Sequence, residues 1–174
     1  PLYLEVAERV YADKPTASAA YSIGIQKLKA KEFRDALDYF EEASELCRDC
    51  IELQQYNLRA GQTAVILGNA SKARTYARKI LAADPQEGDA LILIGDAIAA
   101  SAPNCDDGKL GKAGAYWLAV DYYEKAKRLD PDVASKASQK ISGYKKYFPP
   151  KTEIFFHGLA NGDSYSLECA GGET

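Results

Sequence analysis

The chain has 174 residues, of which 47% are apolar and 27% charged, and its formal net charge is −3 at pH 7. This length and composition are sufficient for one elongated domain with a continuous core. No apolar run approaches the roughly 18 residues of a membrane-spanning helix, and an acidic chain lacks the electrostatic footprint of a nucleic-acid binder. We therefore expect neither a membrane span nor a nucleic-acid partner.

Residues 1–13 predict an amphipathic helix, because Leu4, Ala7, Val10 and Tyr11 recur at helical spacing. The pattern is typical of the second helix of a helix–turn–helix unit whose first helix is missing. Such a helix buries its apolar face only against neighbouring helices, so we expect further units upstream of residue 1.

Residues 17–50 predict two amphipathic helices joined by a tight turn, and the same pattern returns in residues 54–87 and 88–132. Each segment has a glycine in its first helix and two small or aliphatic residues, seven positions apart, in its second helix. Small side chains let paired helices approach closely, and larger ones would overpack the contact. Self-similarity with this period predicts a helical solenoid. The recurring sets are Gly24, Ala36 and Ala43; Gly61, Ala73 and Ile80; and Gly95, Ala119 and Ala126.

The third segment is longer than the other two between its glycine and its first alanine, which places an insertion at residues 102–113. The insertion is rich in Pro, Asn, Asp and Gly, so it predicts a loop. The helix before it, Gly88–Ser101, is nearly apolar along its length, and we expect it to be buried on most sides.

The chain ends with one more predicted helix and a tail. Residues 133–148 have an apolar stripe and a polar back, as the terminal cap of a solenoid requires. In the tail, residues 149–174, apolar residues alternate on both sides of Asn161-Gly162, which predicts a short β-hairpin.

Over residues 17–132, these features resemble the tetratricopeptide repeat (TPR) family. Besides the recurring small residues, the matching positions are Phe40, Tyr123, Pro85 and Pro131. The departures are Ala20, Asn57 and Leu91 where the family has an early Trp, and Arg48 where Pro is common. The resemblance implies an all-α, right-handed superhelix of helix pairs that ends in a capping helix, here followed by the hairpin-like tail.

The end of the chain is similar to the C-terminal part of a group of exported bacterial TPR proteins, through the segments YFPPKTEIFFHGL and GDSYSLEC. In that group a Cys in the insertion recurs together with a Cys in the tail, and Cys105 and Cys169 stand at those places. The resemblance implies a structural disulfide between them and export to an oxidising compartment, either periplasmic or associated with the cell envelope. The alternative is a cytoplasmic protein in which both thiols are reduced.

The other two cysteines, Cys47 and Cys50, lie at the end of an acidic helix. Glu45 and Asp49 beside them disfavour the thiolate that a redox-active pair needs. A four-cysteine zinc site uses two closely spaced pairs, whereas the remaining two cysteines are far apart in sequence. We expect a structural role for this pair, as thiols or as a second disulfide, and no metal, with a thiol or metal function as the third-ranked alternative for the protein.

Catalytic signals are missing from the sequence. His157 is the only histidine, and its aromatic surroundings favour a packed tail residue over a catalytic base. The chain has neither a Gly-rich phosphate loop nor a nucleophile motif. We expect no enzymatic activity and no cofactor.

The TPR resemblance implies that the first helix of each unit lines a concave groove that binds a peptide or a partner protein. Some TPR domains grip chaperone tails through Lys, Asn and Arg at set groove positions, but only Arg59 fits that pattern here. The second hypothesis is a structural or self-associating module in which several of these aliphatic residues are core. The groove positions carried over are Tyr21, Ile25, Leu28, Leu58, Arg59, Gln62, Val65, Ile92, Asp96 and Ala99.

Overall fold

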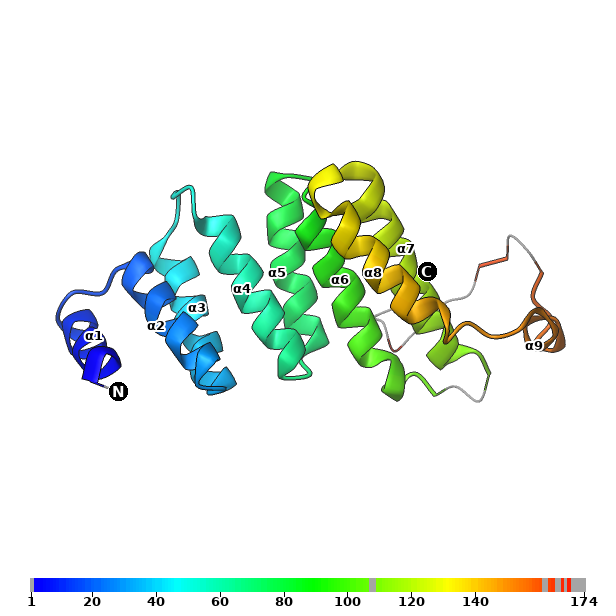
Figure 1. Ribbon diagram of the computed structural model, residues 1–174, viewed down its shortest axis with the longest axis horizontal. Coiled ribbons are helices and arrows are strands. Elements are labelled where there is room, and N and C mark those ends of the chain that lie inside the picture. Colours follow the sequence, from blue (N-terminus) through cyan, green and yellow to red (C-terminus); the bar gives the residue numbers. More distant parts are fainter. Residues whose placement is uncertain (1, 107–108, 161–162, 165–166, 168, 170–174) are drawn as a thin grey trace. The chain divides into compact units, whose positions relative to one another are not determined.

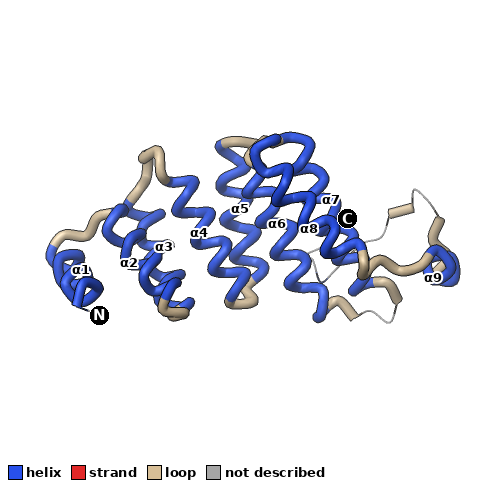
Figure 2. Tube along the Cα trace, in the orientation of Figure 1, coloured by secondary structure: helices blue, strands red, loops and turns tan. Residues whose placement is uncertain are grey.

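The structure is a computed structural model that describes residues 2–106, 109–160, 163–164, 167 and 169. The chain divides into two compact units, Pro1–Ala83 and Asp84–Thr174. The described residues form helices and connecting loops, and no strand is found among them (Figures 1 and 2). None of these helices is long and apolar enough to cross a membrane.

The first unit consists of five helices that follow one another along the chain (Figure 1). Each of α2, α3 and α4 packs against the helix that precedes it and the helix that follows it. The bounds are α1 Leu2–Asp13, α2 Ala17–Lys29, α3 Phe33–Leu46, α4 Leu53–Ile66 and α5 Ala70–Ala83.

The glycine in α2 lies where α2 crosses α3. A Cβ atom added to Gly24 would lie 2.7 Å from the ring of Phe40, which is itself fully buried. Any larger residue at this position would therefore push the two helices apart. The close approach brings Phe40 into one core with Ala36, Ala60 and Tyr76, so the core extends from α3 to α5.

Both helix pairs of the first unit turn through the same backbone motif. At the end of α4, Gly68 has φ +73°, and the next residue, Asn69, donates its N–H to the carbonyl of Ala64 at 2.8 Å. At the end of α2, Lys31 has φ 64°, and Glu32 donates in the same way to the carbonyl of Lys27 at 3.0 Å. These Schellman turns satisfy carbonyl groups at the helix ends, but only Gly68 occupies the left-handed conformation without steric cost.

The second unit contains one tightly packed helix pair and a capping helix. Helix α6 is buried on nearly all sides, and a Cβ atom added to Gly95 would lie 2.5 Å from the ring of Tyr123 in α7. Helix α8 packs against α7 through an apolar stripe that includes Ala137 and Ile141. The elements are α6 Gly88–Ser101, the 3₁₀ turn η1 Ala102–Asn104, α7 Gly111–Leu129, the 3₁₀ turn η2 Pro131–Val133, α8 Ala134–Lys145 and α9 Lys151–Phe156.

The side chain of Asp130 holds the end of α7 to the start of α6. One carboxylate oxygen accepts from the N–H of Gly88 at 3.1 Å, and the other accepts from the N–H of Asp132 at 3.0 Å. Helix N-termini have unsatisfied N–H groups, so one aspartate caps both the first turn of α6 and the turn η2.

The prediction of a β-hairpin in the tail is wrong for its first arm. Residues Lys151–Phe156 form the short helix α9 instead of a strand. Pro150 has an extended conformation that suits a helix start, and its carbonyl accepts from the N–H groups of Glu153 and Ile154. The predicted turn at Asn161-Gly162 lies outside the described residues.

Two predicted boundaries also differ from the structure. Helix α7 begins at Gly111, so the last part of the predicted insertion 102–113 is helical. Residues 107–108 of that insertion lie outside the described residues. Helix α8 ends at Lys145, short of the predicted end at Phe148, and the chain leaves it through turns at Tyr147 and Phe148.

Candidate functional site

The first part of the candidate site is one face of α2. Tyr21, Ile25 and Leu28 follow one another at helical spacing, and all three are only partly buried. Each packs on one side against the core around Phe40. These residues therefore contribute to the core while leaving part of their apolar surface accessible.

The second part is the corresponding face of α4, where Leu58, Gln62 and Val65 share the same spacing. These residues and Arg59 are also partly buried. The guanidinium of Arg59 donates to the side-chain oxygen of Gln62 at 3.2 Å, which orients a cation and an amide beside the apolar residues. We refer to these four residues together with Tyr21, Ile25 and Leu28 as the α2/α4 face.

Contacts between α2 and α4 join the two parts. The side-chain amide of Gln55 donates to the hydroxyl of Tyr21 at 3.0 Å. The ring of Tyr21 lies 4.9 Å from that of Tyr56 and 5.6 Å from that of Phe40, measured between centroids. Tyr21 is thus held by contacts with both neighbouring helices, so the α2/α4 face has a fixed aromatic residue at one end.

In the second unit, the groove positions predicted on α6 are either buried or already paired, unlike the partly accessible residues of the α2/α4 face. Ile92 and Ala99 are buried, with exposed fractions of 1% and 5%. Asp96 accepts hydrogen bonds from the hydroxyl of Tyr123 at 2.7 Å and from the ammonium of Lys140 at 2.6 Å. The two residues on this helix expected to give apolar contacts are core, and its carboxylate already has two partners.

Tyr123 is the buried centre of this network. The ammonium of Lys140 lies 5.6 Å from its ring centroid, and Tyr144 stacks at 5.9 Å. Burial raises the pKa of Tyr123 far above its usual value, and the neighbouring carboxylate of Asp96 raises it further. Tyr123 therefore stays protonated and donates to Asp96 under all ordinary conditions.

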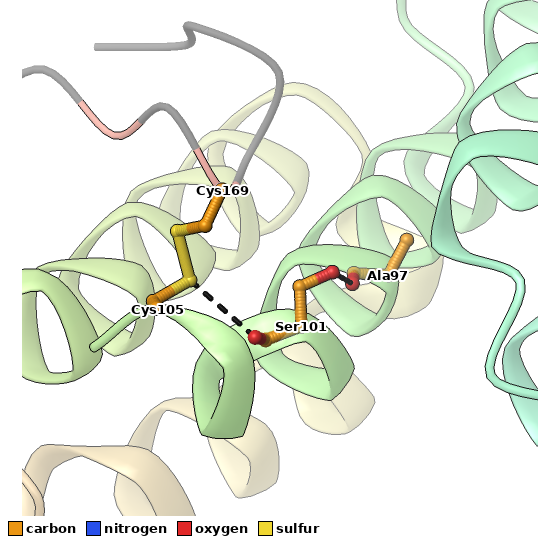
Figure 3. Close-up of a disulfide and its surroundings, with 4 residues drawn as sticks. All are labelled: Ala97, Ser101, Cys105 and Cys169. Atoms are coloured by element: carbon orange, nitrogen blue, oxygen red, sulfur yellow. Dashed lines mark hydrogen bonds between the residues drawn. A yellow bond between two sulfur atoms is a disulfide. The ribbon is translucent and has the colours of Figure 1, made fainter. Parts of the chain in front are cut away.

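The structure brings Cys105 and Cys169 together, with their sulfur atoms at bonding distance and their Cα atoms 5.3 Å apart (Figure 3). Cys105 is buried and its sulfur lies 3.4 Å from the carbonyl oxygen of Ser101, whose hydroxyl donates to the carbonyl of Ala97 at 2.9 Å. This geometry supports the predicted bridge between the tail and the loop before α7.

Cys47 and Cys50 are also paired, with Cα atoms 5.4 Å apart. Ligand atoms of Cys47, Cys50 and Glu52 lie within 4.8 Å of one another, so the reduced thiols could share a metal ion with this carboxylate. A disulfide sulfur carries no thiolate charge, and only the reduced pair could act in this way.

The only histidine does not pack as predicted. His157 is exposed at the end of α9, so the prediction of a packed tail residue is wrong. Phe155 and Phe156 before it are exposed as well, at 78% and 84%.

Sequence reasoning missed a cavity of about 1030 Å³ in the second unit, between α7, the end of α8 and the tail. Trp117 and Phe148 line it together with Asp121 and Leu167. The residues come from three segments that the sequence separates by many positions. The presence of the only tryptophan in the chain was the single available signal.

Comparison with known proteins identifies the fold. No protein-family model matches the chain, and a search of the curated proteins gives no significant match. Among solved structures, the TPR domain of Sgt2 from Aspergillus fumigatus has a TM-score of 0.58 at 18% identity and covers 86% of this chain and 87% of that one. MamA, from residue 41 to its end, from Desulfovibrio magneticus RS-1 has a TM-score of 0.50 at 16% identity, with coverages of 83% and 82%. The helix pairs described above therefore have the fold of a TPR domain.

Proposed function

We propose that the protein is a non-catalytic interaction scaffold that binds a peptide or an extended segment of a partner protein along the α2/α4 face. The main support is that all seven residues of this face are partly buried, so each is anchored in the fold and still accessible to a partner. Extended peptides and amphipathic helices bind through apolar anchors flanked by polar groups that fix their orientation. The face has both, since its aliphatic residues lie beside Tyr21, Arg59 and Gln62.

The proposal assigns this role to the first unit only. The corresponding positions on α6 are buried or already paired, so they offer a partner little free apolar surface and no free carboxylate. Arg59 is the cation of the α2/α4 face, which favours a partner segment that carries a carboxylate beside its apolar residues.

Site-specific cross-linking tests the position of the binding face. The photoreactive residue p-benzoylphenylalanine replaces Leu58 on α4 or, as the matched control, the exposed Thr75 on α5. We expect the Leu58 variant alone to capture a partner from an extract, and mass spectrometry then identifies the cross-linked segment. Equal capture from Thr75 would contradict the proposal, and a cross-link to a second copy of the chain would favour self-association instead.

A synthetic peptide of the cross-linked segment then tests the chemistry. We expect Arg59→Ala to weaken its binding about tenfold in calorimetry, by loss of one charge-assisted contact. Arg48→Ala is the control, because Arg48 lies outside the α2/α4 face, is exposed to solvent and has no ion pair among the described residues. Equal affinities of the two variants would exclude Arg59 from the binding site.

We also propose that the protein is exported to an oxidising compartment, as in the bacterial group that its C-terminal end resembles. Support comes from the two cysteine pairs at bonding distance, because disulfides persist in such compartments and are rare in the cytosol. Alkylation of thiols in intact cells, followed by peptide mapping, tests this. Four alkylated cysteines would favour the cytoplasmic alternative, whereas four protected ones support export.

A further inference from the structure

The cavity of about 1030 Å³ in the second unit lies away from the α2/α4 face and has the size of a small-molecule site. Ligand sites in proteins are clefts of roughly 300–1,000 Å³ with apolar walls and a few polar groups. Its lining residues come from α7, from the end of α8 and the turn after it, and from α9 together with residues 159–160, 163–164 and 167.

Aromatic and aliphatic side chains form most of these walls. Trp117 and Phe148 meet edge to face, with ring centroids 5.8 Å apart. Phe155 and Leu159 belong to the opposite wall, and Leu167 is buried there. An apolar body of a ligand would therefore find the rings of Trp117 and Phe148 together with aliphatic side chains.

Carboxylates follow the tryptophan on the same face of α7. Asp121 and Glu124 lie four and seven positions after Trp117 and line the same cavity. Glu124 faces Lys145 at 3.7 Å, and Asp163 accepts from the backbone N–H of Ala160 at 2.6 Å. Within the described part of the chain, Asp121 is the cavity carboxylate that has neither an ion pair nor a hydrogen bond.

The surroundings of Asp121 favour neutralisation of its charge. Burial raises the pKa of its carboxyl group above the usual range, and the nearby charge of Glu124 raises it further. Its side chain is still accessible to solvent, so a ligand can reach it. A bound cation would relieve both effects at once.

We infer that this cavity binds a small organic amine, in which a protonated nitrogen pairs with Asp121 and an aromatic or aliphatic body contacts Trp117 and Phe148. Cations bind favourably over aromatic faces, most strongly over tryptophan. Two cations, Lys145 and Lys151, also line the cavity, but three carboxylates outnumber them and Lys145 already faces Glu124, so an anion is disfavoured. The inference does not depend on peptide binding at the α2/α4 face.

The bridge between Cys105 and Cys169 holds one wall of the cavity in place. Cys169 lies two residues after Leu167, and Cys105 lies in the loop that leads into α7. Without the bridge, the tail is attached to the helices that form the other walls only through the backbone that follows α8. Binding of the amine should therefore require the oxidised protein.

The experiment uses the full chain in its oxidised form and the emission of Trp117, the only tryptophan, as the reporter. Three probes share one apolar body and differ in charge: 2-phenylethylamine, 2-phenylethanol and 3-phenylpropanoate. Each is titrated at neutral pH into wild type, Asp121→Asn and the control Asp132→Asn. Asp132 is an exposed aspartate of the same unit that does not line the cavity.

We expect the amine to change the emission of Trp117 and to bind about tenfold more tightly than the alcohol and the carboxylate. Asp121→Asn should remove about this tenfold preference, and Asp132→Asn should leave it unchanged. Cys169→Ser should weaken amine binding by at least about tenfold while the far-UV circular dichroism stays helical.

Several results would overturn the inference. Equal affinity for the three probes, an unchanged amine affinity in Asp121→Asn, or absence of any amine binding would each exclude a cation site. A blocked peptide, acetyl-Phe-Lys-Phe-amide, serves as a further probe. If it binds much more tightly than 2-phenylethylamine, the cavity is a peptide-docking site and not a small-molecule site.

Discussion

The backbone at Lys31 offers a sharp test of how the helix pairs turn. Lys31 and Gly68 occupy equivalent positions in two Schellman turns, with φ values of 64° and 73°. The lysine side chain is exposed and has no hydrogen bond or ion pair among the described residues. Replacing it with glycine changes the backbone energy and removes no observed contact.

The magnitude follows from two opposing terms. An L-residue in the left-handed helical conformation costs roughly 1–2 kcal/mol, and Lys31→Gly removes that cost. Glycine also makes the unfolded chain more flexible, which lowers stability by about 0.5–1 kcal/mol. The net expectation is a stabilisation of about 0.5–1 kcal/mol. The reverse change, Gly68→Lys, should destabilise by a similar amount, because a Cβ atom there meets no other atom within 4 Å.

Thermal unfolding followed by circular dichroism measures both changes. For a chain of this length, 1 kcal/mol corresponds to about 2–4 °C in Tm, so we expect Lys31→Gly to raise Tm by about 1–4 °C. The control is Lys29→Gly, the same substitution within α2, which should lower stability by about 1 kcal/mol. A fall in Tm for Lys31→Gly comparable with that of Lys29→Gly would refute the reasoning.

Three further predictions concern the second unit. Tyr123→Phe should lower the free energy of unfolding by about 1–2 kcal/mol, since it removes the hydrogen bond to Asp96. The pKa of Tyr123 is raised in the folded state, so protonated Tyr123 stabilises the fold below pH 10 and this stabilisation is lost at higher pH. Urea titrations at alkaline pH should therefore show a smaller loss of stability for Tyr123→Phe than for wild type. Asp121→Asn should be more stable than wild type at neutral pH but not near pH 3. The raised pKa of the Asp121 carboxyl group means that its ionisation opposes folding, and near pH 3 the group is protonated in both states. Urea midpoints at the two pH values measure this difference. Cys169→Ser should cost about 4 kcal/mol in the chain-entropy account of a bridge spanning 64 positions, and an unchanged urea midpoint would contradict a bridge to Cys105.

The helix pairs were predictable from the sequence because their packing depends on residue size at a fixed spacing. Gly24 lies against Phe40 and Gly95 against Tyr123, as the recurring pattern of glycines and small residues requires. The apolar segment Gly88–Ser101 forms a helix with the predicted bounds and is buried as expected. In each case the decisive contact is between neighbouring helices, so a short stretch of sequence contains both partners.

The tail was not predictable in the same way. Alternation of apolar residues over only a few positions, as at Ile154 and Phe156, does not separate a strand from one turn of helix. The start signal of α9 was present in the sequence, because Pro150 precedes a segment with Glu153 in its first turn. The hairpin prediction gave more weight to the alternation than to this signal.

The candidate sites depend on contacts between distant residues, which one sequence does not reveal. The pattern placed Asp96 at a groove position, but its partner Lys140 lies 44 positions further along the chain. The cavity was missed for the same reason, since Trp117, Phe148 and Leu167 meet only after three separate segments have packed.

The capping helix explains why the two units offer different surfaces to a partner. Lys136 and Lys140 of α8 pair with Asp89 and Asp96 of α6, so the cap supplies α6 with the cations that an external ligand would otherwise provide. A peptide bound along α6 would have to displace α8 or compete with Lys140 for the same carboxylate. Among the described residues, no cation from a capping helix pairs with the α2/α4 face. Its polar groups hydrogen-bond only to residues of α2 and α4. The partly accessible α2/α4 face in the first unit and the paired carboxylates of α6 in the second therefore result from one repeated architecture with different side chains at equivalent positions.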